Sequence, residues 1–410
     1  MPRLHAHTRC AALALAGLAV LLPSRARAIL DVEDRGPTLQ AGAFAMRITN
    51  IGVIGNPFFD IGRSFDPSFE YPRGSGNELL KHADLWVGAV NTLGHARVSG
   101  GPLLEWRPTL DPEDRVRLAY GGLPHTRRFF DDDGDGKVDE ELLNGRDDDG
   151  DGQVDEDLGI SAAQMAAAEY TDDQPAAVAY AYPNGETHEP LHLHVRQEAY
   201  AWSVPGYDRV AGLQFVITNI GSETLHDLWV GLFTDLDSRG PGDAGGHLND
   251  RLTSRSYSRT FNDGFSRVPT VQVGNPPGPY VQTCINTDSG TWPVVTDGLP
   301  GSGLPAAAVM GLSHSLDPIA QMVKNGLVPP SALPFTYAPA QRQFRWSVYA
   351  NDEPPGQGGP PILDADRYRA MTGGYPGVTD TLQAHDYVVL VSCGPFPAVP
   401  PGRSLEVNFA

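Results

Sequence analysis

Two near-copies of an acidic decapeptide place carboxylates at a spacing suited to metal binding. The first copy reads "DDDGDGKVDE" from Asp131, and the second reads "DDDGDGQVDE" from Asp147, sixteen residues later. Residues 131–157 hold fourteen acids against Lys137 and Arg146, a net charge of −12. Alternating aspartates let a tightly curled backbone aim several oxygens at one point, and glycine at the sixth position permits the sharp turn that this needs.

The ligand set predicted by this spacing contains oxygen donors only. The first, third, fifth and ninth residues offer carboxylates, and the seventh offers its main-chain carbonyl. The tenth residue, or a carboxylate lent by the neighbouring copy, completes the shell. Because such a set favours calcium, we predict two calcium loops. Their ligands are Asp131, Asp133, Asp135, Lys137, Asp139 and Glu140, then Asp147, Asp149, Asp151, Gln153, Asp155 and Glu156.

The alternative interpretation of this segment is a solvated acidic linker. A linker needs charge, but it does not need glycine and valine in the same register twice. We expect Val138 and Val154 to pin the two loops to apolar surface.

The repeat resembles the calcium loops of EF-hand, dockerin and thrombospondin type 3 repeats. "NGRDDDGDGQVDED" from Asn144 is similar to a repeat of uncharacterised exported bacterial proteins. The chain departs from the EF-hand at the twelfth positions, where Leu142 and Leu158 replace a bidentate glutamate. No amphipathic helices are expected on either side. The pattern therefore predicts a structural clamp, not a calcium sensor.

The first 28 residues have the pattern of a secretory signal peptide. Arg3 and Arg9 precede a twelve-residue apolar run, Ala11 to Leu22, and small residues follow at positions 26 and 28. The run is too short to span a membrane, and no later stretch reaches about eighteen uninterrupted apolar residues. We expect a secreted or cell-surface protein. Removing four arginines from a chain of net charge −20 leaves about −24, which argues against nucleic acid or anionic lipid as a partner.

Apolar residues alternate in many short runs, as in half-buried strands. Examples are Leu213, Phe215 and Ile217, and Leu405, Val407 and Phe409. Continuous runs at 228–233 and 387–393 suit central strands. We predict a mostly β, antiparallel β-sandwich with long loops rich in glycine and proline and a few short helices. The predicted organisation is a signal peptide (1–28), an N-terminal β-rich region (29–130), the calcium-loop insert (131–157) and a sandwich domain (158–410).

Three helices and one long loop region are expected at specific places. Ser161 would cap a helix over 162–169, a short helix would open at Asp317 and Pro318, and Asp364 would cap a helix through 371. Residues 238–305, which are dense in Gly, Pro, Asn and Asp, predict long loops.

Most of the mature chain resembles large exported proteins of Gram-negative bacteria, many of which end in a type IX secretion sorting domain. The segments that carry the resemblance are "FEYPRGSGNELLKHADLWVGAV", "EPLHLHVRQEAYAWS" and "FVITNIGSETLHDLWVGLFTDLD". The resemblance implies a β-rich protein of the envelope or surface, and it transfers no catalytic residue. "PPGRSLEVNFA" stops within an expected strand without a sorting tail, so we expect a chain truncated at its C-terminus.

A second metal site is predicted around Asp235, Asp237 and Asp250. The first two acids lie two apart at a strand end and share one face, and Asp250 follows a glycine-rich stretch that could fold back over them. The alternative is that the first two cap the strand end by accepting hydrogen bonds from loop amides.

The sequence favours a non-enzymatic, calcium-binding role that is structural or ligand-binding, with a cell-surface glycan or a protein as a further partner. The alternative is a calcium-dependent extracellular hydrolase of polysaccharide with its site in residues 238–305. Tyr280 and Trp292 offer aromatics there, but the acids near them, Asp288 and Asp297, have no supporting pattern. "HEPLH" at 188–192 matches a zinc-protease signature, but its proline opposes the helix that this chemistry needs.

Cys284 and Cys393 are the cysteines that remain after removal of the signal peptide. In an exported protein such a pair favours a disulfide, and the alternative is two buried thiols. A bridge across this span would contribute about 4–5 kcal/mol in the chain-entropy model. We expect thiol titration of the denatured, unreduced protein from an oxidising compartment to find no thiol. Two titratable thiols would exclude the bridge.

Overall fold

The structure, a computed structural model, describes residues 37–56, 67–100, 105–109, 111, 113–178, 186–238, 248–262, 285–297, 306–315, 318–324, 327, 343–380 and 383–410. This part of the chain is mostly β, with eighteen strands and three short helices. The helices are α1 (Pro175–Val178), α2 (Pro318–Lys324) and α3 (Asp364–Met371). The prediction of a mostly β fold built from antiparallel sheets is confirmed.

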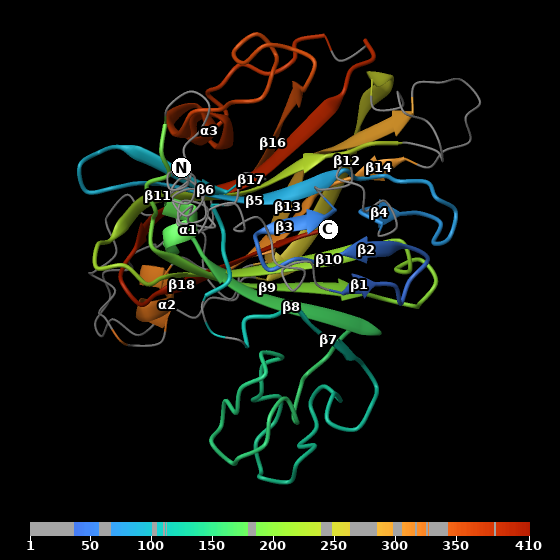
Figure 1. The fold of residues 1–410 in the computed structure, drawn as a ribbon, viewed down its shortest axis with the longest axis vertical. Helices are drawn as coiled ribbons and strands as arrows, with labels where there is room; N and C mark the ends of the chain where they lie inside the picture. Colours follow the sequence, from blue (N-terminus) through green and yellow to red (C-terminus); the bar gives the residue numbers. More distant parts are fainter. Residues whose placement is uncertain are drawn as a thin grey trace, which may run out of the picture.

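The strands form four sheets (Figure 1). One contains β1 (Thr38–Leu39), β2 (Ala45–Arg47) and β4 (Phe69–Glu70). A six-stranded sheet contains, in spatial order, β15 (Gly311–His314), β18 (Ser404–Phe409), β10 (Ala211–Asn219), β9 (Leu193–Ala201), β8 (Gln164–Thr171) and β7 (Arg117–Tyr120). The other contains β16 (Gln343–Ala350), β17 (Tyr387–Val399), β11 (Leu225–Asp235), β5 (His82–Val90) and β3 (Val53–Gly55), with β6 (Ala96–Gly100) beside β5. The last contains β12 (Asp250–Asn262), β13 (Ile285–Asp297) and β14 (Ala307–Ala308).

The alternating apolar runs form strands whose buried side chains oppose one another. β10 and β18 are antiparallel neighbours, and their predicted inward-facing residues meet in register. The continuous runs form β11 and β17, which are interior strands as predicted. The opposed buried pairs of β10 and β18 are Leu213–Phe409, Phe215–Val407 and Ile217–Leu405.

The grouping of the strands differs from a plain two-sheet sandwich. Four sheets form a ring that resembles a four-bladed propeller. The largest core cluster nevertheless contains side chains from both six-stranded sheets, including Val87 and Leu232 from one and Phe215 and Val407 from the other. The additional sheets arise from short N-terminal strands and from a hairpin that the sequence pattern did not reveal.

The predicted helix over 162–169 is wrong, because residues 164–171 form strand β8 between β7 and β9. Ala166 packs into the main core, whereas Met165 and Ala167 pack into a separate cluster on the other face. Burial with a period of two therefore overrides the helix propensity of alanine. The helix that begins at Asp364 is confirmed, but its N-cap is Leu363, without a side-chain cap.

The prediction of long loops over 238–305 is wrong for much of that region. Strands β12 and β13, of thirteen residues each, pair along their full length. Leu252 and Val295 belong to the main core, but the strands are otherwise rich in Thr, Ser and Arg, which hid their pattern. Cys393 is buried on β17. Cys284 lies outside the described residues, so the disulfide stays a prediction.

A buried ion-pair network fastens α3 to the sheet that contains β6. Arg367 donates to both carboxylate oxygens of Glu105, at 3.0 and 3.1 Å, and to Asp364 at 2.5 Å. All three residues are at most 3 % exposed, and His188 Nδ1 lies 3.5 Å from Glu105. Burial alone would raise the pKa of Glu105, but the Arg367 guanidinium and His188 lower it below its ordinary range.

Arg367→Met would leave Glu105 and Asp364 buried without their cation. We expect urea denaturation to show a loss of about 3–5 kcal/mol in the free energy of unfolding. Because the pKa of Glu105 is lowered in the fold, its contribution is present above the ordinary carboxylate range and is lost as the pH falls through the folded value. The difference between wild type and variant should therefore shrink in acid.

Arg369→Met is the matched control, because it lies on the same helix and pairs with Asp366 at 3.0 Å on the surface. Its loss should stay below about 1 kcal/mol. Equal losses for the two variants would contradict a special role for the buried network.

Candidate metal centre

The acidic repeat lies in the segment that joins β7 to β8 and forms a lobe at the bottom of Figure 1. A small apolar cluster supports it, in which Leu143, Leu158 and Ile160 pack with Met165 of β8. Val138 and Val154 are 47 % and 50 % exposed, so the prediction that they pin the loops is wrong. The leucines after each loop take that role.

The first copy curls around the carboxylate of its first residue. Asp131 accepts hydrogen bonds from the amides of Gly134 (2.6 Å) and Gly136 (3.0 Å). Asp133 accepts from the amide of Asp135 at 3.0 Å. Both glycines have positive φ, 91° and 95°, which only glycine adopts without strain.

The second copy repeats this geometry almost atom for atom. Asp147 accepts from the amides of Gly150 (2.6 Å) and Gly152 (2.9 Å), and Asp149 accepts from Asp151 at 3.0 Å. The glycines again have positive φ, 90° and 97°. The two sequence repeats are therefore two copies of one loop fold.

The ninth carboxylates face the entry of each loop. Asp139 accepts from the amide of Phe129 at 3.0 Å, and Asp155 accepts from Asn144 and Gly145 at 2.9 Å. These hydrogen bonds close each loop. That Asp139 and Asp155 bind the metal stays a prediction.

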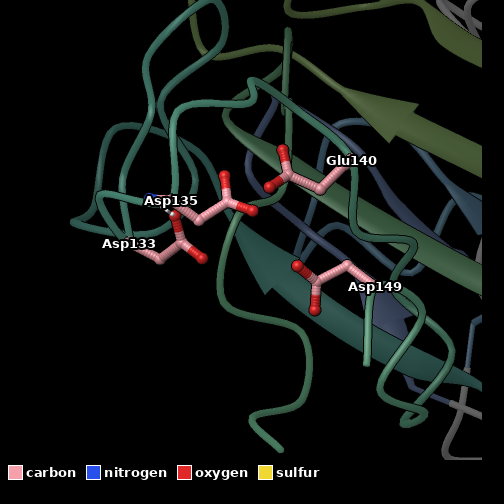
Figure 2. A group of neighbouring side chains, drawn as sticks. All are labelled: Asp133, Asp135, Glu140 and Asp149. Atoms are coloured by element: carbon pink, nitrogen blue, oxygen red, sulfur yellow. Dashed lines mark hydrogen bonds between the residues drawn. The ribbon is translucent and has the colours of Figure 1, made fainter. Parts of the chain in front are cut away.

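The remaining carboxylates converge between the copies. Asp133, Asp135 and Glu140 of the first copy and Asp149 of the second offer oxygens that all lie within 4.8 Å of one another. Figure 2 shows these four side chains pointing toward a common space. A carboxylate lent by the neighbouring copy is thus present.

The sharing between copies is reciprocal. Asp133 of the first copy joins Asp151 and Glu156 of the second in another group with the same spacing. In each copy the third aspartate therefore lies beside the tenth glutamate of the other. Two ions bound at these two groups would have Asp133 in common.

Two eleventh-position acids, Glu141 and Asp157, belong to the site but were missed by the sequence reasoning. Glu141 groups with Asp149 and Glu156, while Asp157 groups with Asp131 and Asp133. Both are buried, at 4 % and 0 % exposed. An acid at the eleventh position of both copies was the signal that could have identified them.

Glu140 and Glu156, the tenth residues of the two copies, have the most unfavourable electrostatic surroundings in the insert. Both carboxylate oxygens of Glu140 and of Glu156 are buried and make no hydrogen bond. Burial, together with neighbouring carboxylates, raises the pKa of Glu140 and raises that of Glu156 to about 7. Such oxygens gain most from a cation placed between them.

Basic side chains hold the loops together only in part. The ammonium of Lys137 lies 2.8 Å from Asp135 and 2.9 Å from Asp149, which joins the two copies. Arg146 binds Asp114 at 2.6 Å and Glu169 of β8 at 3.0 Å, which fixes the second loop to the sheet.

The other predicted metal residues are buried in the body of the protein. Asp235 ends β11, Asp237 follows it, and Asp250 begins β12; all three are at most 2 % exposed. Burial first, and then repulsion from Asp237 and other acids, raises the pKa of Asp250 to about 9.

The remaining candidate motifs do not form a site in the described residues. Residues 188–192 are not helical; His188 faces Glu105, whereas His192 lies 3.4 Å from Asp173 at the surface. Tyr280 falls outside the described residues, as do the side chains of Asp288, Trp292 and Asp297.

Comparison with known families and curated proteins finds no family model and no curated sequence that matches the chain. The resemblance to exported bacterial proteins therefore stays a prediction. In the described part of the chain, no helix is long and apolar enough to cross a membrane.

Lys137→Gln gives the first loop the residue that the second has at the same position, Gln153. Because the ammonium competes with a divalent ion for Asp135 and Asp149, we expect calorimetry to show calcium affinity raised several-fold. Lys137→Arg, which keeps the charge, should stay near wild type. Weaker binding by the glutamine variant would show that the side chain supports the site.

Proposed function

We propose that the chain is a secreted or surface-associated calcium-binding protein with a non-enzymatic, structural or ligand-binding role. The observation that carries the proposal is the pair of identical loops whose tenth glutamates lie among aspartates of the other copy. The buried oxygens of these glutamates make no hydrogen bond, so the residues present fit a bound cation.

Calcium is the ion that suits this donor set best. The converging groups are carboxylates without histidine or cysteine, and they lie on curled backbone that tolerates a large, irregular shell. Magnesium demands a stricter octahedral shell and keeps its waters. Bound calcium would offset the mutual repulsion of the carboxylates and hold the two loops together.

A clamp fits the surroundings of the loops better than a switch. The loops are flanked by strands β7 and β8, so no helix pair is present to open on binding. Leu142 and Leu158 stand where a sensor loop has its bidentate glutamate. Extracellular loops of this kind bind calcium at about 10⁻⁴–10⁻³ M. At millimolar calcium, a Kd of about 10⁻⁴ M would stabilise the fold by roughly 1.4 kcal/mol per site.

Export and the final location follow from the signal-peptide pattern of residues 1–28 and from the resemblance described above. Within this proposal the two six-stranded sheets pack as a sandwich around the shared core, which is supported by the side chains that both contribute to it. A cell-surface glycan or protein is the expected further partner. No described residue favours the hydrolase alternative.

Chelation should expose the insert to protease. Without calcium the fourteen acids of residues 131–157 repel one another. We expect limited proteolysis in chelator to cut between Phe130 and Gly159, and calcium to protect that segment. The double variant Asp133→Asn/Asp149→Asn, which lacks both shared aspartates, should be cut in either condition. Identical digestion of the wild-type chain with and without calcium would refute the clamp.

A further inference from the structure

We propose a second divalent-cation site, inside the body of the protein, formed by Asp235, Asp237, Asp250 and Asp386. These carboxylates come from the end of β11, the start of β12 and the residue before β17. The site is separate from the acidic loops and does not depend on them. It goes beyond the clamp because it joins strands of different sheets.

Backbone pairing brings the segments that carry the acids together, because Asp235 of β11 lies opposite Val388 of β17, two residues after Asp386. The amide of Lys81 donates to the carbonyl of Asp235 at 2.9 Å, and the amide of Asp237 donates to Leu79 at 3.2 Å. The amide of His385 donates to the carbonyl of Asp250 at 3.2 Å. The acids are therefore held by the edges of folded sheets, and their positions do not rely on a flexible loop.

Asp250 is the observation that points to a ligand. Its side chain is fully buried, and neither carboxylate oxygen makes a hydrogen bond of normal geometry, although the backbone of Ser238 is a polar neighbour. Asp235, at 1 % exposed, also has one oxygen without a hydrogen bond, while the other accepts from Asn351 at 3.2 Å. Burying an ionised carboxylate in this way is costly unless a cation is beside it.

Two basic side chains lie beside Asp235. Lys81 Nζ lies 3.6 Å from Asp235, and His82 Nε2 lies 3.7 Å from it. His82 is also engaged by the buried Asp84 at 3.0 Å. The fully buried Asp250 is instead repelled by Asp237, Asp386 and Asp235. A divalent ion at the four aspartates would offset the repulsion between them.

Two alternatives make different demands on Asp250. A strand-end cap would accept loop amides at normal hydrogen-bond geometry, as Asp131 does in the insert, whereas the backbone of Ser238 lies beside Asp250 without that geometry. A permanently protonated Asp250 would be neutral without any ion. Asparagine copies the shape of the neutral acid, so it would replace a protonated Asp250 with little effect but could not replace a charged ligand of a cation.

The donor set selects the class of ion. Four carboxylates are hard oxygen donors, which favour calcium, magnesium or manganese over softer metals. The experiment uses calcium as the probe ion, and the same measurements are repeated with magnesium and with manganese.

The test uses the full mature chain with Asp133→Asn and Asp149→Asn, which silences the acidic loops. Bound calcium per chain is counted by native mass spectrometry after equilibration at millimolar calcium, and the melting temperature is measured in calcium and in chelator. Asp250→Asn is then added to this parent. The matched control is Asp352→Asn, a neighbouring acid that pairs with His385 and whose side chain is 38 % exposed.

We expect the parent to bind one ion and to melt at a higher temperature in calcium than in chelator. Asp250→Asn should bind none, lose the calcium-dependent rise, and melt in chelator close to the parent, because without an ion the raised pKa of Asp250 favours its neutral form, which asparagine copies. Asp352→Asn should behave as the parent.

A parent that binds no divalent ion in any arm overturns the proposal, as does an Asp250→Asn variant that still binds one. If Asp250→Asn does not fold, Asp386→Asn takes its place, and we expect the same loss of calcium binding. The number of ions that the parent binds tests the proposal even without either variant. If the intact chain binds no more calcium than the parent, the clamp fails instead and the internal site is unaffected.

Discussion

Repulsion between carboxylates that are held close together and away from water is the constraint on which this structure depends. In the insert, Glu140 and Glu156 lie among the aspartates of the opposite loop. In the body, Asp250 is fully buried beside other acids. In both places the fold removes carboxylate oxygens from solvent without giving each a hydrogen bond, which favours either a proton on the carboxyl or an opposing charge beside it.

One buried carboxylate of this protein receives its opposing charge from a side chain. Glu105 is as deeply buried as Asp250, but a bidentate contact with Arg367 lowers its pKa. Glu156 and Asp250 have no such guanidinium, and their pKa values are raised to about 7 and about 9. Asp364, which Arg367 also contacts, still has a raised pKa because burial outweighs the guanidinium there. The direction of each shift therefore reflects the balance between burial and the opposing charge.

Sequence reasoning succeeded where the chemistry is local and failed where it depends on packing. The alternation in β10 and β18, and the turns at Gly136 and Gly152, follow from neighbouring residues and were predictable. The exposure of Val138 and Val154 was not predictable from neighbouring residues, because it depends on which parts of the protein pack against the loop. The sharing of third aspartates between copies was foreseen only as an option, since loop spacing does not fix how two loops pack. Alanine-rich β8 and the polar hairpin β12–β13 were misjudged because their neighbouring strands decide their conformation.

The two proposed sites should respond to calcium over different concentration ranges. The carboxylates of the body are already positioned by hydrogen bonds between strands, so binding there orders little additional chain. The insert is fixed to the sheet mainly through Arg146 and a small leucine cluster, and binding must also bear the cost of ordering its loops. The internal site should therefore fill at lower calcium and stay filled, as part of the folded body. Under the proposed function, the insert is then the element whose order follows the surrounding calcium concentration.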